Sequence, residues 1–109
     1  MLTRRGFLAA AVVTPFAFGS IHATRPLKVL LDTDIGSDID DAVALSYLLK
    51  KPGCNLLGVT TVTGDAVNRA RLVKALCEAA GKSIPIYPGL EKPLVIEQKQ
   101  LSAAQAERL

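Results

Sequence analysis

The sequence predicts an α/β fold in which parallel strands alternate with helices. Three short apolar runs, at 27–31, 56–63 and 84–87, are typical of buried strands. Two longer amphipathic segments, at 42–51 and 66–80, lie between them and have the length of crossover helices. The order β-α-β-α-β therefore indicates a Rossmann-like open parallel sheet with helical crossovers, of which only the N-terminal part is present.

The first predicted strand and helix are recognised by their ends. The apolar strand 27–31 stops at Asp32, and the next helix begins after the three aspartates at 38, 40 and 41. Acidic residues in a first turn and basic residues such as Lys50 in a last turn complement the helix dipole. A Pro-Gly pair at 52–53 then ends the helix, so we expect a turn before the second strand.

The second strand and helix follow the same pattern. The strand 56–63 is rich in β-branched residues, and a Gly-Asp pair turns the chain after it. The helix 66–80 ends before Gly81, a residue suited to a helix C-cap. Its predicted inward side chains are Leu72, Val73, Leu76 and Cys77.

The remaining residues predict one more strand and one more helix. After the short strand 84–87 we expect a loop, and Ser102 is placed to cap a last helix that runs to Leu109. A three-stranded parallel sheet has unpaired edges and a small core, so its stability alone is marginal. We therefore expect these residues to be the opening of a larger domain.

Residues 1–23 are predicted to be an export signal. A pair of arginines at 4–5 precedes an apolar run at 7–18 that is too short to span a membrane, and small residues lead to Ala23. The arginine pair followed by Phe and Leu resembles a twin-arginine signal, and an ordinary secretory leader is the alternative. In both cases we expect an exported, periplasmic or secreted protein whose domain occupies residues 24–109.

The composition argues against several classes of function. The net charge is +3, but only +1 remains without the two arginines of the signal. A nucleic-acid-binding domain would instead cluster basic residues on one face. The single histidine, His22, lies in the signal, so the chain offers no Cys/His cluster for zinc. We expect Cys54 and Cys77 to be free and partly buried. A disulfide between them is the alternative, because disulfides form in the compartments to which proteins are exported.

Five of the six aspartates lie within residues 32–41. They begin at the carboxyl end of a predicted strand and finish at a helix start, which is where open α/β sheets bind ligands. Asp32 and Asp34 share strand parity, so we expect them to point the same way, and Gly36 permits a tight turn. Converging carboxylates suit a hard divalent cation such as Ca²⁺ or Mg²⁺. Such a cation lowers the pKa of a coordinated water, which a neighbouring carboxylate then deprotonates.

Three other interpretations of the aspartates are weaker. An EF-hand loop would have Gly36 and Ser37 at its fifth and sixth positions and Val43, not Glu, at its twelfth. Phosphatases that form an aspartyl-phosphate share the Asp-x-Asp start, but Ile35 and Gly36 break their Asp-x-Asp-Gly-Thr pattern. A helix cap among residues 38–41 accounts for one aspartate and leaves the others unexplained.

The aspartate motif and three later segments resemble a known family. Val-Leu-Leu-Asp-Thr-Asp-Ile-Gly at 29–36 and Asp-Asp-Ala-Val-Ala-Leu at 40–45 are similar to the N-terminal signature of the inosine-uridine-preferring nucleoside hydrolases. The similarity continues through 58–64, 85–89 and 92–94, so it covers almost the whole chain after the signal.

The resemblance implies calcium-dependent hydrolysis of the N-glycosidic bond of ribonucleosides to a free base and ribose, a reaction of nucleoside salvage. Carried over by residue, Asp34 binds Ca²⁺ and takes the proton from the attacking water, and Asp41 is a second calcium ligand. Asp40 holds a ribose hydroxyl, and Asp32 supports the loop. The transition state is oxocarbenium-like, so carboxylates around the sugar stabilise its positive charge.

The chain departs from the family pattern at three places. Ile35 stands where the family more often has proline, and residues 37–39 are partly an insertion. Because of this insertion, Asp38 is an alternative to Asp40 as the sugar contact. Asp65 stands where the family often has asparagine, which makes it a weaker substrate-contact candidate; a simple turn role is equally compatible with it.

The resemblance further implies that more calcium ligands, the base contacts and the leaving-group acid come from downstream segments. We therefore expect the chain to be inactive alone unless more sequence follows or another chain completes it. The implied partner is a ribonucleoside, with no nucleic acid and no stable membrane span after signal cleavage, and a homo-oligomer stays open. The rival functions are a non-catalytic calcium- and ribosyl-binding module and a metal-dependent hydrolase of another ribosyl substrate.

Overall fold

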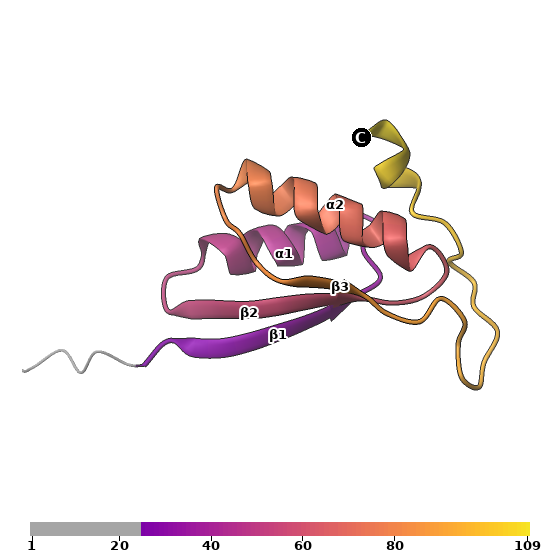
Figure 1. Ribbon diagram of the computed structural model, residues 1–109, viewed down its shortest axis with the longest axis horizontal. Helices are drawn as coiled ribbons and strands as arrows, with labels where there is room; N and C mark the ends of the chain where they lie inside the picture. Colours follow the sequence, from indigo (N-terminus) through magenta and orange to yellow (C-terminus); the bar gives the residue numbers. More distant parts are fainter. Residues whose placement is uncertain (1–24) are drawn as a thin grey trace, which may run out of the picture.

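The computed structural model describes residues 25–109, so the predicted export signal lies outside the described residues. The strands form one three-stranded sheet. Figure 1 shows both long helices on the same face of it. The elements, in chain order, are β1 (Leu27–Thr33), α1 (Asp40–Lys50), β2 (Cys54–Thr61), α2 (Ala66–Ala79), β3 (Ile86–Pro88) and a short 3₁₀ helix, η1 (Ala104–Arg108).

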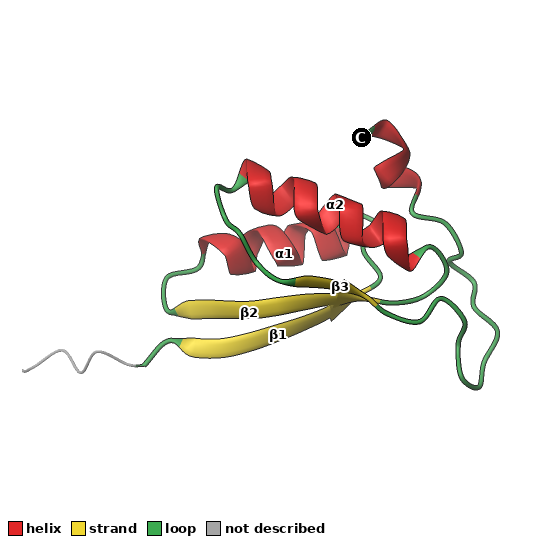
Figure 2. Cartoon of the chain, in the orientation of Figure 1, coloured by secondary structure: helices red, strands yellow, loops and turns green. Residues whose placement is uncertain are grey.

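The sheet has the strand order β1-β2-β3, and both strand pairs are parallel. Each connection between neighbouring strands crosses over through a helix, as the colouring by secondary structure makes clear (Figure 2). The described residues thus confirm the predicted β-α-β-α-β order and the α/β class. All three strands end at the same edge of the sheet, and this edge carries the aspartate loop.

Several element boundaries differ from the sequence prediction. The second strand begins and ends two residues earlier than expected. It cannot extend to Thr63, which adopts a positive φ of 76°. The third strand pairs only over Ile86–Pro88. The predicted last helix is present only as a five-residue 3₁₀ helix, and its predicted cap at Ser102 was wrong, because no side chain caps it. The carbonyl of Ser102 instead accepts a hydrogen bond from the Ser37 hydroxyl, at 2.9 Å.

The end of α2 confirms the predicted glycine cap. Gly81 has a φ of +66°, which only glycine adopts without strain. The amide of Gly81 donates to the carbonyl of Glu78 and the amide of Lys82 donates to that of Cys77, both at 2.9 Å. These two bonds are the Schellman pattern, and they satisfy carbonyls that the helix end leaves without a partner.

The hydrophobic core lies between the helices and one face of the sheet. Its most deeply buried side chains are Ile35, Leu45, Val59, Val73 and Cys77. On the strands, Leu31 and Ile86 pack against this core, so their neighbours point to the other face. There Leu30 is 76% and Tyr87 63% exposed. Within residues 25–109, that second face of the sheet has no covering layer.

Residues 25–109 contain no helix with both the length and the apolar character that a membrane span requires. The longest helix, α2, has 14 residues.

Candidate functional site

The candidate site lies at the carboxyl edge of the sheet, where the loops after the three strands meet (Figure 1). Main-chain hydrogen bonds join these loops to one another. The amide of Val62 donates to the carbonyl of Thr33 at 3.1 Å, and the amide of Thr63 donates to that of Leu90 at 3.1 Å. The amide of Gly64 donates to the carbonyl of Glu91 at 2.8 Å. The loops therefore form one connected layer.

Two of the predicted site residues, Asp34 and Asp41, are direct neighbours in this layer. A hydrogen bond between their side chains, partial burial and the negative charge of Asp41 raise the pKa of Asp34 above its ordinary value. The charge of Arg69 opposes this shift of the pKa but does not cancel it. Two carboxyl groups in contact repel one another when both are ionised, so the pair favours either a shared proton or a bound cation.

The buried residue Thr33 holds this pair in place. Its hydroxyl donates to Oδ2 of Asp41 at 2.6 Å and accepts from the amide of Ile35 at 3.1 Å. Ile35 is fully buried, and a proline at this position would have no amide hydrogen for the second bond. Ile35, which stands where the resembled family more often has proline, thus helps to hold the Thr33 hydroxyl that binds Asp41.

The other aspartates of the loop have separate partners. Asp32 accepts a 2.5 Å hydrogen bond from the Thr60 hydroxyl, and Asp38 accepts a 2.7 Å hydrogen bond from Nε2 of the Gln100 side chain. Strand pairing ends at Thr33, so the parity argument does not extend to Asp34. Asp40 is exposed at the first position of α1. The residue at the N-cap of α1 is Ile39, with no side-chain capping bond, so helix capping does not explain these aspartates.

Asp65 does act as a helix cap. Its carboxylate accepts from the Asn68 amide at 3.4 Å and from the Asn68 side chain at 2.7 Å, at the start of α2. This contact accounts for the residue without a substrate, as the turn interpretation expects. The neighbouring Thr63 has the one positive φ of a non-glycine residue within 25–109, a strained conformation beside the aspartate loop.

The donor set of the pair fits part of a metal site. Carboxylate oxygens are the ligands that hard divalent cations prefer, and a cation between Asp34 and Asp41 would remove their repulsion. Calcium takes six to eight oxygens. Among the described residues, however, no group of three or more Asp, Glu, Cys or His side chains is placed to hold an ion. The expected convergence of several carboxylates is therefore limited to two.

Arg69 is a site residue that the sequence prediction missed. Its side chain is fully buried and donates hydrogen bonds to the loops after β1 and β2 and to the segment after β3. The available signal was its position on the apolar face of α2, three residues before Leu72 and four before Val73. A charged residue on a buried helix face requires polar partners, which here are at the aspartate loop.

Comparison with known proteins identifies the family of the chain. The sequence profile of the inosine-uridine preferring nucleoside hydrolase family matches residues 29–107. The chain belongs to this family.

The curated proteins that the chain resembles include nucleoside hydrolases. The chain is 34% identical over 73 residues to the pyrimidine-specific ribonucleoside hydrolase RihB of Escherichia coli strains SE11 and K12 / DH10B, and of Escherichia fergusonii. Each match covers 65% of this chain and 23% of the relative. The chain thus spans about a quarter of the length of these relatives.

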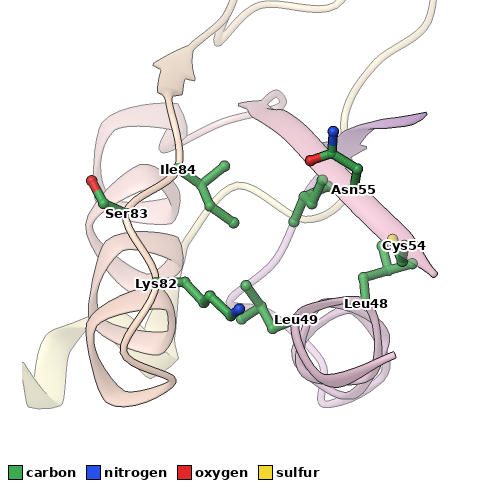
Figure 3. A pocket seen from close by; sticks show the side chains of 8 residues that line it. Leu48, Leu49, Cys54, Asn55, Lys82, Ser83 and Ile84 are labelled. Carbon is green, nitrogen blue, oxygen red and sulfur yellow. The ribbon is translucent and has the colours of Figure 1, made fainter. Parts of the chain in front are cut away.

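A depression in the chain lies at the other end of the sheet. Figure 3 shows it between the end of α1, the start of β2 and the segment after α2. Its lining residues are Leu48, Leu49, Cys54, Asn55, Leu56, Lys82, Ser83 and Ile84. None of the predicted site residues lines it, and it contains no carboxylate for a cation or a proton transfer. The predicted site residues therefore lie at the carboxyl edge, away from this depression.

Proposed function

We propose that the protein containing this chain hydrolyses the N-glycosidic bond of ribonucleosides, releasing a free base and ribose. The observation that carries the proposal is the adjacent pair Asp34 and Asp41, held at the carboxyl edge of a parallel sheet in a chain of this family. Ligands of open α/β folds bind at this edge. The relatives named above act on pyrimidine ribonucleosides, which supports a ribonucleoside as the substrate class.

In the proposed site, Asp34 and Asp41 would each supply a carboxylate ligand to a calcium ion. When bound, the ion supplies positive charge that lowers the pKa of a coordinated water. Asp34 accepts the proton of the attacking water, and the hydroxyl of Thr33 keeps Asp41 in position. The carboxylates together stabilise the positive charge that develops on the sugar ring in an oxocarbenium-like transition state.

Asp40 is the proposed contact for a ribose hydroxyl. It is exposed at the start of α1, whereas Asp38 already accepts a hydrogen bond from Gln100. This difference favours Asp40 over its alternative, since a carboxylate with an accessible oxygen binds a sugar hydroxyl without first losing a protein contact. Asp32, bonded to Thr60, supports the strand end.

The test is ribose release by the protein purified from its own cells. Uridine and inosine are supplied as substrates, with calcium and again with a chelator. We expect release with calcium and its loss with the chelator. Asp34→Asn, which keeps the shape but not the base, should lower kcat by about 10²–10⁴-fold. Glu78→Gln is the matched control, because it removes one negative charge from an exposed residue at the far end of α2.

Each other outcome selects a rival function. Binding of calcium and ribosides without any ribose release would replace the hydrolase with a non-catalytic binding module. Release of ribose from other ribosyl compounds, but from neither nucleoside, would keep the chemistry and change the substrate. Equal kcat in Asp34→Asn and the unmodified protein would remove Asp34 from the mechanism.

We also propose that this protein works outside the cytoplasm, with residues 1–23 as a twin-arginine signal. Cell fractionation tests this with a double substitution of Arg4→Lys and Arg5→Lys. The unmodified protein should appear in the periplasm or medium, and the variant should stay in the cytoplasm. An unchanged distribution would favour the ordinary secretory leader.

A further inference from the structure

Arg69 is the most deeply buried charged residue of the described chain. It lies in the first turns of α2, and its relative exposure is 0%. Arginine keeps its charge at any pH at which proteins fold, so this burial places a permanent positive charge inside the molecule. Such a charge is stable only when polar groups surround it.

The guanidinium group finds those polar groups in three separate segments. In the loop after β1, Nη1 donates to the carbonyl of Asp34, to that of Ile35 at 2.8 Å and to the Ser37 hydroxyl at 3.1 Å. In the loop after β2, Nε donates to the carbonyl of Thr63 at 2.8 Å. After β3, Nη2 donates to the carbonyl of Gln100 at 2.9 Å.

A purely structural position in the core would not require these hydrogen bonds of Arg69. Leu72 and Val73 on the same helix face are buried without polar partners, and an apolar side chain at 69 would extend that face. No carboxylate pairs with Arg69 among the described residues, where the ion pair found joins Lys74 and Glu78. Four of its five acceptors are instead main-chain carbonyls, and two of these belong to Asp34 and to the next residue, Ile35.

We propose that Arg69 is a positioning residue that sets the path of the main chain through Asp34 and Ile35, and thereby places the Asp34 carboxylate beside Asp41. The inference deepens the proposed function, because the carboxylate that it places is the proposed base and cation ligand. The planar, five-donor fork of arginine is required for this role, since the acceptors lie on three segments around it. Lysine, with one nitrogen, reaches only part of this set.

The first test compares Arg69→Lys with Val73→Ala in the full protein. Val73 is equally buried on the same helix face, so its truncation destabilises the core without touching the loop contacts. Hydrogen–deuterium exchange is measured at temperatures where both variants stay folded. We expect Arg69→Lys to speed exchange at least tenfold in residues 34–41 and less than twofold in β2. Val73→Ala should show no such preference.

The second test measures calcium affinity by titration calorimetry, and kcat and KM for the hydrolysed nucleoside. For Arg69→Lys we expect a dissociation constant for calcium raised at least tenfold, and a kcat lowered at least tenfold with a smaller change in KM. Val73→Ala should keep all three within twofold of the unmodified protein. A merely structural arginine would give Arg69→Lys the same profile as Val73→Ala, and that result would overturn the inference.

The inference and the proposed function fail in different ways. If the unmodified protein releases no ribose from any nucleoside, the function fails, while the exchange pattern of residues 34–41 still tests Arg69. If Arg69→Lys does not fold, hydrogen–deuterium exchange in the unmodified protein tests the inference instead. Protection of residues 34–37 comparable to that of β2 supports the inference. Exchange as fast as in the exposed residues 91–97 overturns it.

Discussion

The two ends of the sheet are built in opposite ways. At the carboxyl end, buried polar groups join three loops, and a glycine there lets another segment pack directly on the chain: a Cβ on Gly64 would overlap the carbonyl group of Leu101. At the amino end, Gly53 and Gly81 also have positive φ, but no atom lies within 4 Å of a Cβ built on either. Similar backbone shapes thus serve a packed site at one end and open turns at the other.

The largest effect should come from a matched pair of glycine substitutions. Gly64→Ala meets both an unfavourable positive φ and the Leu101 carbonyl, so we expect a loss of roughly 2–5 kcal/mol in the free energy of unfolding. Gly53→Ala meets only the unfavourable φ, which costs about 1–2 kcal/mol. Denaturant unfolding of both variants gives the difference. Equal losses would mean that the two ends of the sheet are packed alike.

A smaller effect should come from two threonines that differ only in their surroundings. Thr33→Val removes a buried hydroxyl and leaves the Ile35 amide without an acceptor, which costs about 1–3 kcal/mol of stability. Thr60→Val removes an exposed hydroxyl that binds Asp32, and its change should stay within about 0.5 kcal/mol.

The same two variants also report on the site. Because Thr33 holds Asp41, Thr33→Val should weaken calcium binding, whereas Thr60→Val should leave it unchanged within twofold. Titration calorimetry measures both affinities. If only Thr60→Val weakened calcium binding, the contact that supports the cation would be that of Thr60 with Asp32, not that of Thr33 with Asp41.

The smallest effect concerns the cysteines, which are both free. Burial, with a smaller contribution from the charge of Glu78, raises the pKa of the Cys77 thiol, so little thiolate forms there near neutral pH. We expect iodoacetamide to modify the half-buried Cys54 about tenfold faster or more, and the rate at Cys77 to rise with pH. Mass spectrometry of the labelled protein measures both rates. Similar rates for the two thiols near neutral pH would contradict the burial of Cys77.

Calcium should change neither rate, because both cysteines lie away from the aspartate loop: Cys54 begins β2, and Cys77 is near the end of α2. Protection of either thiol by calcium would show that the cation binds elsewhere or couples the two ends of the sheet.

The order of the elements was predictable because it depends on local apolar patterns. The strand around Val59 and the helix around Val73 carry patterns of different period, and these survive in the structure. The element ends were less predictable, because they depend on contacts from distant residues. Ser102 is an example: its neighbourhood permits a cap, but its carbonyl binds Ser37, which lies 65 residues away.

The location of the candidate site was predictable, but the hydrogen bonds within it were not. The density of aspartates after a strand indicates the carboxyl edge, and Asp34 and Asp41 do meet there. The other contacts could not be deduced, because the bond of Asp32 with Thr60 depends on the register between two strands and that of Asp38 with Gln100 on a segment 62 residues away. Arg69 was overlooked because one sequence alone does not reveal which carbonyls a buried charge will face.

The contacts of Arg69 also join residues that are synthesised at different times. Synthesis proceeds from the N-terminus, so β1, α1 and β2 are complete once Thr61 has emerged. Gln100, the last acceptor of Arg69, follows 39 residues later, roughly 2–8 s at usual rates of translation. The carbonyls of Asp34, Ile35 and Thr63 are thus available to Arg69 well before that of Gln100. A ribosomal pause before Gln100 would leave a nascent chain in which Nη2 of Arg69 still lacks its acceptor.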